Sequence, residues 1–161
     1  MFLFQGAVMG KQLTAGDLCK RKVTVGYEHT SLMDAAQMMR EEHVGSLVVI
    51  ADEDGKRLVR GMVTDRDIVM AVVATGLDPE PLLLEDIMSE RLVSANASDS
   101  LTDLIRSMRE HGVRRVPVVD AQDELVGMVT MDDVLKVLAQ ELSLLVGTID
   151  RGMQHEQVRR Q

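Results

Sequence analysis

Two pairs of residues, each a threonine followed three positions later by an aspartate, have the chemistry needed to hold a nucleoside. They are Thr64 with Asp67 and Thr130 with Asp133, and each follows a short apolar run typical of a strand. Backbone N–H groups at the start of the helix that follows are unpaired and suit a phosphate, to which the threonine hydroxyl can add a donor. The carboxylate can accept both hydroxyls of a ribose. These four residues are therefore the first candidates for ligand binding.

The same spacing also has a purely structural explanation. Thr-x-x-Asp before an apolar run resembles a capping box, with aspartate in the place where glutamate or glutamine is usual. Ser31-x-x-Asp34 and Ser100-x-x-Asp103 show the same pattern with no ligand implied. Helix capping and ligand binding are compatible, because both use the same helix start. The spacing alone leaves both explanations open.

The two pairs belong to a duplicated sequence. The segment Gly61-Met62-Val63-Thr64-x-x-Asp67 matches Gly127-Met128-Val129-Thr130-x-x-Asp133, and Ser31 aligns with Ser100 further upstream. The register changes only in the polar segment 52–57, where the first copy is longer. A duplication must be recognised first, because it determines the fold that the sequence predicts.

Each copy predicts a β-α-β-β-α unit. A strand at Val23–Val25 or Leu92–Ser94 precedes a helix that starts at Ser31 or Ser100. The helices carry apolar residues at the i, i+3, i+4, i+7 spacing of one buried face: Leu32, Ala35, Ala36 and Met39, and Leu101, Leu104, Ile105 and Met108. Two hairpins follow, Leu47–Ile50 with Leu58–Val63 and Val116–Val119 with Leu125–Val129. A second helix begins after Thr64 or Thr130.

These units define the expected organisation of an α/β (α+β) protein. We expect an N-terminal extension at 1–12, one repeat at 13–75, a linker at 76–84, a second repeat at 85–150 and a polar tail at 151–161. Gly76, Pro79 and Pro81 mark the linker. One unit alone buries too little surface for stability, so we expect the copies to pack about a pseudo-twofold axis.

Composition excludes several classes of protein. The net charge of −8 and pI of about 5.0 argue against broad binding to nucleic acid or to an anionic membrane. No run approaches the roughly 20 apolar residues of a membrane helix. The single Cys19 excludes an internal disulfide framework and fits a reducing cytoplasm. The four histidines lack the spacing of a metal site, so we expect none.

The duplicated segments resemble CBS domains, which occur in tandem pairs called Bateman modules. The resemblance rests on Val44–Ile50, Val113–Asp120 and the two Gly-Met-Val-Thr-x-x-Asp motifs, and it spans Leu13 to Val146. It implies a stand-alone pair with two mixed three-stranded sheets facing each other, helices outside and two symmetry-related clefts. It also implies that the two threonines lie near phosphate or ribose and that the two aspartates bind ribose.

A basic pair distinguishes the second copy from the first. Arg114 and Arg115 stand where the first copy has Gly45 and Ser46. In CBS pairs that bind nucleotide phosphates, basic residues at this place reach into the shared cleft, and the planar arginine fork matches phosphate. Further candidates are Arg66 inside the first motif and, among the strand residues that can sandwich a base, Val116 and Pro117. The alternative is a solvated basic pair on an acidic surface.

This asymmetry leads to a hypothesis: the two clefts differ in affinity, and the one reached by Arg115 favours a phosphorylated ligand. Val134, Leu138, Leu142, Leu145 and Ile149 form one stripe on the C-terminal helix. This stripe is explained either by burial in the core or by a dimer contact, and both remain open.

Three functions compete. The first is a regulatory module that senses an adenosyl ligand such as AMP, ADP or ATP and alters the geometry of a homodimer or the binding of a protein partner. The second is a dimeric scaffold or protein-interaction module with a vestigial cleft. The third, an enzyme, is disfavoured because the chain has no P-loop, no Gly-x-Ser-x-Gly and no Cys/His pairing. We therefore expect a cytoplasmic regulatory protein with no obligatory cofactor.

Overall fold

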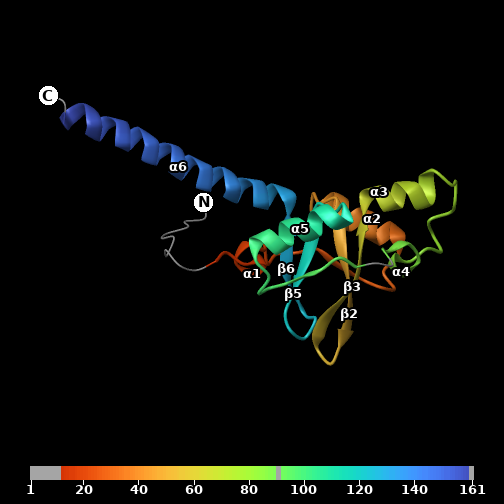
Figure 1. The fold of residues 1–161 in the computed structure, drawn as a ribbon. Coiled ribbons are helices and arrows are strands. Elements are labelled where there is room, and N and C mark those ends of the chain that lie inside the picture. Colours follow the sequence, from red (N-terminus) through yellow and green to blue (C-terminus); the bar gives the residue numbers. More distant parts are fainter. Residues whose placement is uncertain (1–11, 90–91, 160–161) are drawn as a thin grey trace. The chain divides into compact units, whose positions relative to one another are not determined.

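The computed structural model describes residues 12–89 and 92–159 (Figure 1). The chain divides into two compact units, one ending at Val129 and the other beginning at Thr130. Both sheets belong to the first unit, except for the last residue of the final strand. The expected extension at 1–12 lies, but for its last residue, outside the described residues.

Two mixed three-stranded sheets form the framework, as the resemblance to CBS domains implies. The first contains β1 (Val25–Tyr27), β2 (Ser46–Glu53) and β3 (Lys56–Thr64), with β2 in the centre. β1 runs parallel and β3 antiparallel to it. The second sheet is ordered in the same way: β4 (Ala95–Asn96), β5 (Arg115–Val119) and β6 (Leu125–Thr130), with β5 in the centre and β4 parallel to it.

The helices of the described chain differ greatly in length. The short ones are α1 (Ala15–Leu18), α3 (Asp65–Ile68) and α4 (Leu84–Ile87), and α3 continues into a π-helix, η1 (Val69–Val73). The longer ones are α2 (Leu32–Glu41), α5 (Leu101–His111) and α6 (Met131–Arg159). α6 continues into the expected polar tail instead of ending before it.

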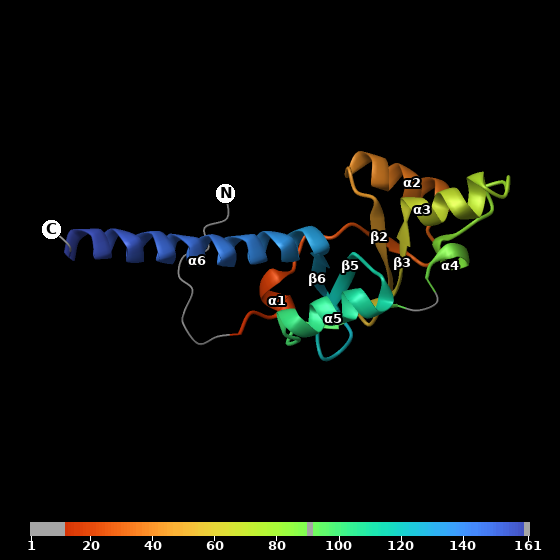
Figure 2. The same cartoon turned by 45° about the horizontal axis from the view of Figure 1, so that its top comes forward.

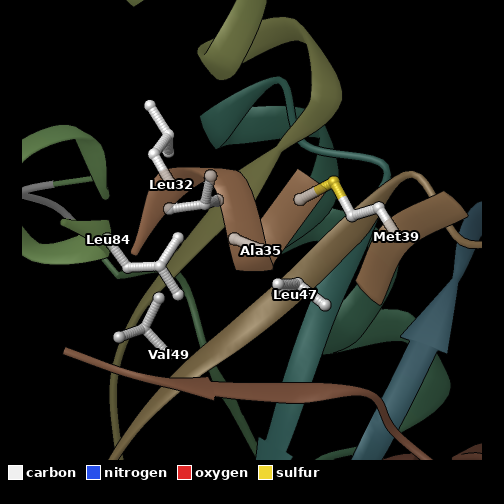
Figure 3. Packing of buried hydrophobic residues seen from close by; sticks show 7 residues of the cluster. Leu32, Ala35, Met39, Leu47, Val49 and Leu84 are labelled. Atoms are coloured by element: carbon white, nitrogen blue, oxygen red, sulfur yellow. The ribbon is translucent and has the colours of Figure 1, made fainter. Parts of the chain in front are cut away.

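Strand β2 is buried on both faces because its two sets of alternating side chains pack on different layers. Leu47 and Val49 pack in one cluster with Leu32, Ala35 and Met39 of α2, as Figure 3 shows. Val48 and Ile50 pack in a second cluster with Leu125 of β6. This second cluster joins the two sheets, and Figure 2 shows α2 and α5 lying beside different sheets.

The two amphipathic helices begin where the sequence predicts. Ser31 caps α2 by accepting from Asp34 N, and Ser100 caps α5 by accepting from Asp103 N, both at 3.1 Å. The fully enclosed positions are the expected ones: Leu32, Ala35 and Met39 in α2, and Leu104 and Met108 in α5. Ala36, Leu101 and Ile105 are half-buried.

The first strand of each repeat was predicted at the wrong place. The predicted strands were Val23–Val25 and Leu92–Ser94, whereas β1 and β4 begin at Val25 and at Ala95. A β-branched run favours extended backbone, but the ladder begins only where the central strand is within reach. That point is fixed by the pairs Val25↔Val48 and Ala95↔Val118.

The short helices α1 and α4 exchange places between the repeats. α1 precedes repeat 1, yet Ala15 N and Gly16 N donate to Asp99 O and Ala97 O, which precede α5. α4 precedes repeat 2, yet Leu84 N donates to Thr30 O, and Leu84 is fully buried in the cluster of α2 and β2. Figures 1 and 2 both show α1 beside α5 and α4 beside α2. Each repeat is therefore completed by the segment that leads into the other.

This exchange explains the glycine of the repeated motif. A Cβ on Gly61 would lie 2.8 Å from Met88 Sδ, and a Cβ on Gly127 would lie 2.7 Å from Lys20 O and 2.8 Å from Cys19 Sγ. All three contacts are closer than carbon can approach these atoms. The motif therefore begins with glycine because the exchanged segment lies directly against the strand.

Candidate ligand-binding site

The first Thr-x-x-Asp motif forms a capping box at the junction of β3 and α3. Thr64 N and Thr64 Oγ1 both donate to Asp67 Oδ2, at 2.8 and 2.7 Å, and Asp67 N donates back to Thr64 Oγ1 at 3.2 Å. Thr64 has extended backbone and Asp65 begins the helix, so the strand ends where the box starts. The capping explanation of the motif is confirmed.

The second motif repeats this frame at the junction of β6 and α6. Thr130 N and Oγ1 donate to Asp133 Oδ2 at 3.1 and 2.6 Å, and Asp133 N donates to Thr130 Oγ1 at 3.3 Å. The surroundings differ, because Asp133 is buried with 8% of its surface exposed, whereas Asp67 is half-buried. The duplication has therefore kept the hydrogen-bond frame in two different environments.

These frames bear on the ligand role expected of the threonines. A hydroxyl has one hydrogen, and in both motifs it is donated to the aspartate of the same box. Thr64 and Thr130 can therefore accept a further hydrogen bond from a ligand hydroxyl, but neither can donate to a phosphate while the box is intact. This geometry favours ribose over phosphate as their partner.

The capping box uses only one of the two carboxylate oxygens of Asp67. Its Oδ2 accepts both bonds from Thr64. Within residues 12–89 and 92–159, no hydrogen bond uses its Oδ1. A carboxylate oxygen has two lone pairs and can accept from ligand hydroxyl groups. The capping box therefore orients Asp67 without using all of its acceptor capacity.

Arg115 approaches the first motif from the other repeat. A Cβ on Gly45 would lie 3.6 Å from a guanidinium nitrogen of Arg115 and 3.0 Å from Asp65 Oδ2. Asp65 N donates to Gly45 O at 3.2 Å, which fixes Gly45 against the start of α3. Arg115, on β5, therefore brings a positive charge beside the junction that carries Thr64.

The other expected site residues occupy more varied positions. Arg114 and Arg66 are exposed, and within the part of the chain that the structure describes neither side chain makes an ion pair. Val116 and Pro117 are buried in β5. The structure thus brings Arg115 beside Gly45 and the start of α3, while Val116 and Pro117 follow it in β5.

Sequence reasoning missed Gly45 and Asp65 as parts of this site. Both could have been found from the alignment of the copies, since Gly45 aligns with Arg114, and Asp65 aligns with Met131. The acidic residue Asp65 of the first motif therefore stands beside Arg115, whereas the apolar Met131 occupies the equivalent position in the second motif.

Two further aspartates accept hydrogen bonds at a helix start. Asp17 bonds Thr14, and Asp86 accepts from Leu83 N.

Neither a metal site nor a membrane-spanning helix is found among the described residues. No group of three or more histidine, cysteine, aspartate or glutamate side chains within 12–89 and 92–159 could hold a metal ion. Among the same residues, no helix has the length and apolar character to cross a membrane. A hollow of about 320 Å³, lined by Tyr27, Glu28, His29 and residues 50–52, contains none of the expected ligand-binding residues.

Comparison with known families gives a clear match. The CBS domain model matches this chain twice, at residues 15–74 and 84–140. Hypoxic response protein 1 of Mycobacterium tuberculosis is 39% identical over 127 residues, which is 79% of this chain and 86% of that protein. The CBS domain-containing protein YhcV of Bacillus subtilis is 37% identical over 117 residues, covering 73% and 79%.

Solved structures share the fold. The crystal structure of Hypoxic Response Protein I with two coordinated zinc ions has a TM-score of 0.68 at 39% identity, covering 77% of this chain and 98% of that one. A hexameric CBS-CP12 protein from bloom-forming cyanobacteria has a TM-score of 0.66 at 27% identity, covering 76% and 69%. The CBS pair of protein MJ0100, in complex with 5′-methylthioadenosine and S-adenosyl-L-methionine, has a TM-score of 0.68, with 81% and 99% covered; its 23% identity supports the fold alone.

Proposed function

Because the chain belongs to the CBS-domain family, we propose that it is a regulatory module that binds an adenosyl ligand beside Thr64 and Asp67. The ligand is AMP, ADP, ATP or a relative, and its binding changes the geometry of a homodimer or the affinity for a protein partner. Such a response requires that the ligand bind two states with different affinity. A cytoplasmic location and the absence of catalysis are part of the same proposal.

One observation carries this proposal: the guanidinium of Arg115 lies beside the junction where Asp67 keeps a carboxylate oxygen for a ligand. A nucleotide needs an acceptor for its ribose hydroxyls and a cation for its phosphate. Both groups come from the first unit, on different repeats. MJ0100, which has the same fold, was solved with two adenosyl compounds, and this supports the choice of ligand class.

Asp65 limits which ligands fit this place. Its carboxylate stands beside the same glycine as the Arg115 guanidinium, and so lowers the positive potential that a phosphate would meet. A monophosphate or an uncharged sulfur nucleoside is therefore expected to bind more tightly than ATP. The start of α6, with Thr130 and Asp133, is the second candidate site, where Met131 replaces the acidic residue.

A thermal-shift panel with AMP, ATP, 5′-methylthioadenosine and S-adenosylmethionine tests the proposal on the full chain. A ligand at about 100 times its dissociation constant stabilises the folded state by roughly 2.7 kcal/mol, which is measurable as a shift in Tm. We expect at least one compound to raise the Tm, and Asp67→Ala and Arg115→Gln to reduce that shift.

Matched variants separate ligand contact from helix capping. Asp103→Ala removes an aspartate from the cap of α5, and Arg109→Gln neutralises an exposed arginine on the same helix. Both controls should keep the ligand-induced shift. No shift with any compound, or an equal loss in the controls, contradicts adenosyl binding.

The second candidate function is a dimeric interaction module with a vestigial site. The exposed leucines of α6 favour it, because large apolar side chains on a surface mark protein contacts. A panel without any shift, together with stable self-association, is the outcome expected from that function.

A further inference from the structure

The long helix α6 exposes large apolar side chains between Leu135 and Ile149. They are Leu135, Leu138, Leu142, Leu144, Leu145, Val146 and Ile149, and all except Leu138 expose more than half of their surface. From Leu138 to Ile149 every residue is exposed. Scattered exposed leucines are ordinary on a protein surface, whereas a contiguous apolar stripe marks an interaction surface.

The spacing of this stripe is that of a coiled coil. Leu135, Leu138, Leu142, Leu145 and Ile149 alternate in steps of three and four residues, which is the a/d pattern of the heptad repeat. Met131 extends the pattern by one further position upstream. We propose that α6 pairs through this seam with α6 of a second copy of this chain.

The helix needs a partner to be stable over this stretch. Most helical stability in proteins comes from packing of an apolar face, and an unpacked helix is marginal in water. Gly147 and Thr148 lie inside α6 and lower its intrinsic helix propensity further, the glycine by about 1 kcal/mol relative to alanine. The seam residues supply the face that packing requires.

The residues that flank the seam favour a second copy over a charged partner. The positions beside it are Ala139, Glu141, Val146 and Thr148, of which only Glu141 is charged. A binding surface for a basic or acidic protein would place complementary charges there, and a pairing of like helices would avoid repeated like charges. The polar residues Lys136, Gln140 and Ser143 lie away from the seam.

The area that such a pairing buries is sufficient. Complete burial of a leucine contributes about 1.5–3 kcal/mol at about 25 cal/mol/Å², which corresponds to roughly 60–120 Å² per side chain. Five seam residues in each of two chains therefore bury on the order of 1,000 Å², the size at which a specific interface becomes credible. The contact needs no part of the adenosyl site, so the two proposals can fail separately.

Sedimentation velocity of the full chain over a range of concentrations tests this proposal. We expect wild-type protein to sediment as two or more copies and Leu142→Glu to sediment as a monomer, with a rise of at least tenfold in the dissociation constant. Gln140→Glu adds the same charge on the opposite side of the helix and should assemble as wild type does. Leu142 is exposed, so both variants should keep the fold, which circular dichroism can check.

A cysteine at the seam gives a second measurement. Leu145→Cys in a Cys19→Ser background should form an intermolecular disulfide under mild oxidation, since a d position faces its own copy in a parallel pair. A monomeric wild type overturns the proposal, and so does assembly that persists in Leu142→Glu. If the disulfide does not form but Leu142→Glu still abolishes assembly, the seam is supported and the two helices pair in the antiparallel form.

Discussion

The two Thr-x-x-Asp junctions share a hydrogen-bond frame and differ in almost everything around it. In both, the threonine hydroxyl donates to the aspartate, at 2.7 Å in Thr64 and 2.6 Å in Thr130. The first junction leads into the short α3 and a π-helix, whereas the second begins the 29-residue α6. Asp67 is half-buried and Asp133 is buried.

This comparison separates what the fold requires from what function can change. The frame is required because it ends a strand and starts a helix within one residue. The neighbours are free to differ, so Asp65 stands beside Arg115 at the first junction while Met131 takes its position at the second. A duplicated motif can therefore keep one structural role in both copies while the residues around it diverge.

The largest expected effect concerns the motif glycines. In Gly127→Ala the new methyl group meets the backbone oxygen of Lys20, which cannot move without shifting the chain, and we expect a loss of about 2–3 kcal/mol. In Gly61→Ala it meets the flexible thioether of Met88, and the loss should be about 1 kcal/mol. Urea unfolding of both variants measures the difference. Equal losses would show that the two exchanged segments are held alike.

Removal of the capping threonines should have the next largest effect. Thr64→Ala removes the cap of α3 and should cost about 1 kcal/mol. Thr130→Ala should cost somewhat more, about 1.5–2 kcal/mol, because Asp133 is buried and loses a hydrogen-bond donor away from water. Ser31→Ala, at a cap with no assigned ligand, gives the reference value in chemical denaturation. A smaller loss at Thr130 than at Thr64 would contradict this ranking.

The reactivity of Cys19 reports on the second junction alone, because its sulfur lies against Gly127. Burial raises the pKa of the Cys19 thiol, so less of the reactive thiolate is present at a given pH. We expect a thiol reagent at pH 8 to react more slowly with the native protein than with the protein in urea. Gly127→Ala should accelerate the native reaction and Gly61→Ala should leave it unchanged. The reverse order would mean that Cys19 does not pack at that strand.

The smallest effect is expected at the cap of α5, which has no ligand role. The hydrogen bond from Ser100, together with Arg106, lowers the pKa of the Asp103 carboxyl below its usual value. A lowered pKa in the folded state stabilises the protein above the pKa of the unfolded chain, and this contribution disappears as the pH falls through the folded value. Urea unfolding from pH 7 to pH 3 should show the Ser100→Ala variant approaching wild type at the acid end. If the difference in unfolding free energy between Ser100→Ala and wild type stays constant with pH, the stabilisation comes from the Ser100 hydroxyl alone and not from the charge of Asp103.

Much of the fold follows from the sequence because the relevant signals are local. Ser31 and Ser100 are followed by apolar residues at helical spacing, and both helices begin there. The hairpins are also where alternation and turn residues place them, with Asp54 and Gly55 both at positive φ in the first turn. The crystal structure of Hypoxic Response Protein I has the same fold, in agreement with the two-sheet arrangement.

The features that could not be predicted from the sequence depend on contacts between segments that are far apart in the chain. The starts of β1 and β4 are set by the reach of the central strand, not by their own β-branched residues. The exchange of α1 and α4 cannot be predicted from an alignment of the two copies. The aligned sequences are the same whether the first segment of a repeat packs on its own repeat or on the other one. The neighbourhood of Arg115 likewise required the spatial relation of Gly45 and β5. Ligand contact by the nine candidate residues stays a prediction.

The exchanged segments also dictate an order of events during synthesis. The first repeat cannot close its core when its own last helix has been made, because Leu84 belongs to that core and lies at the far end of the linker. α1, in contrast, is synthesised first and must wait for Met128, whose backbone bonds Lys20. At a translation rate of about 5–20 residues per second, that wait is on the order of ten seconds. The nascent chain therefore carries α1 without its partner strand until Met128 has been synthesised.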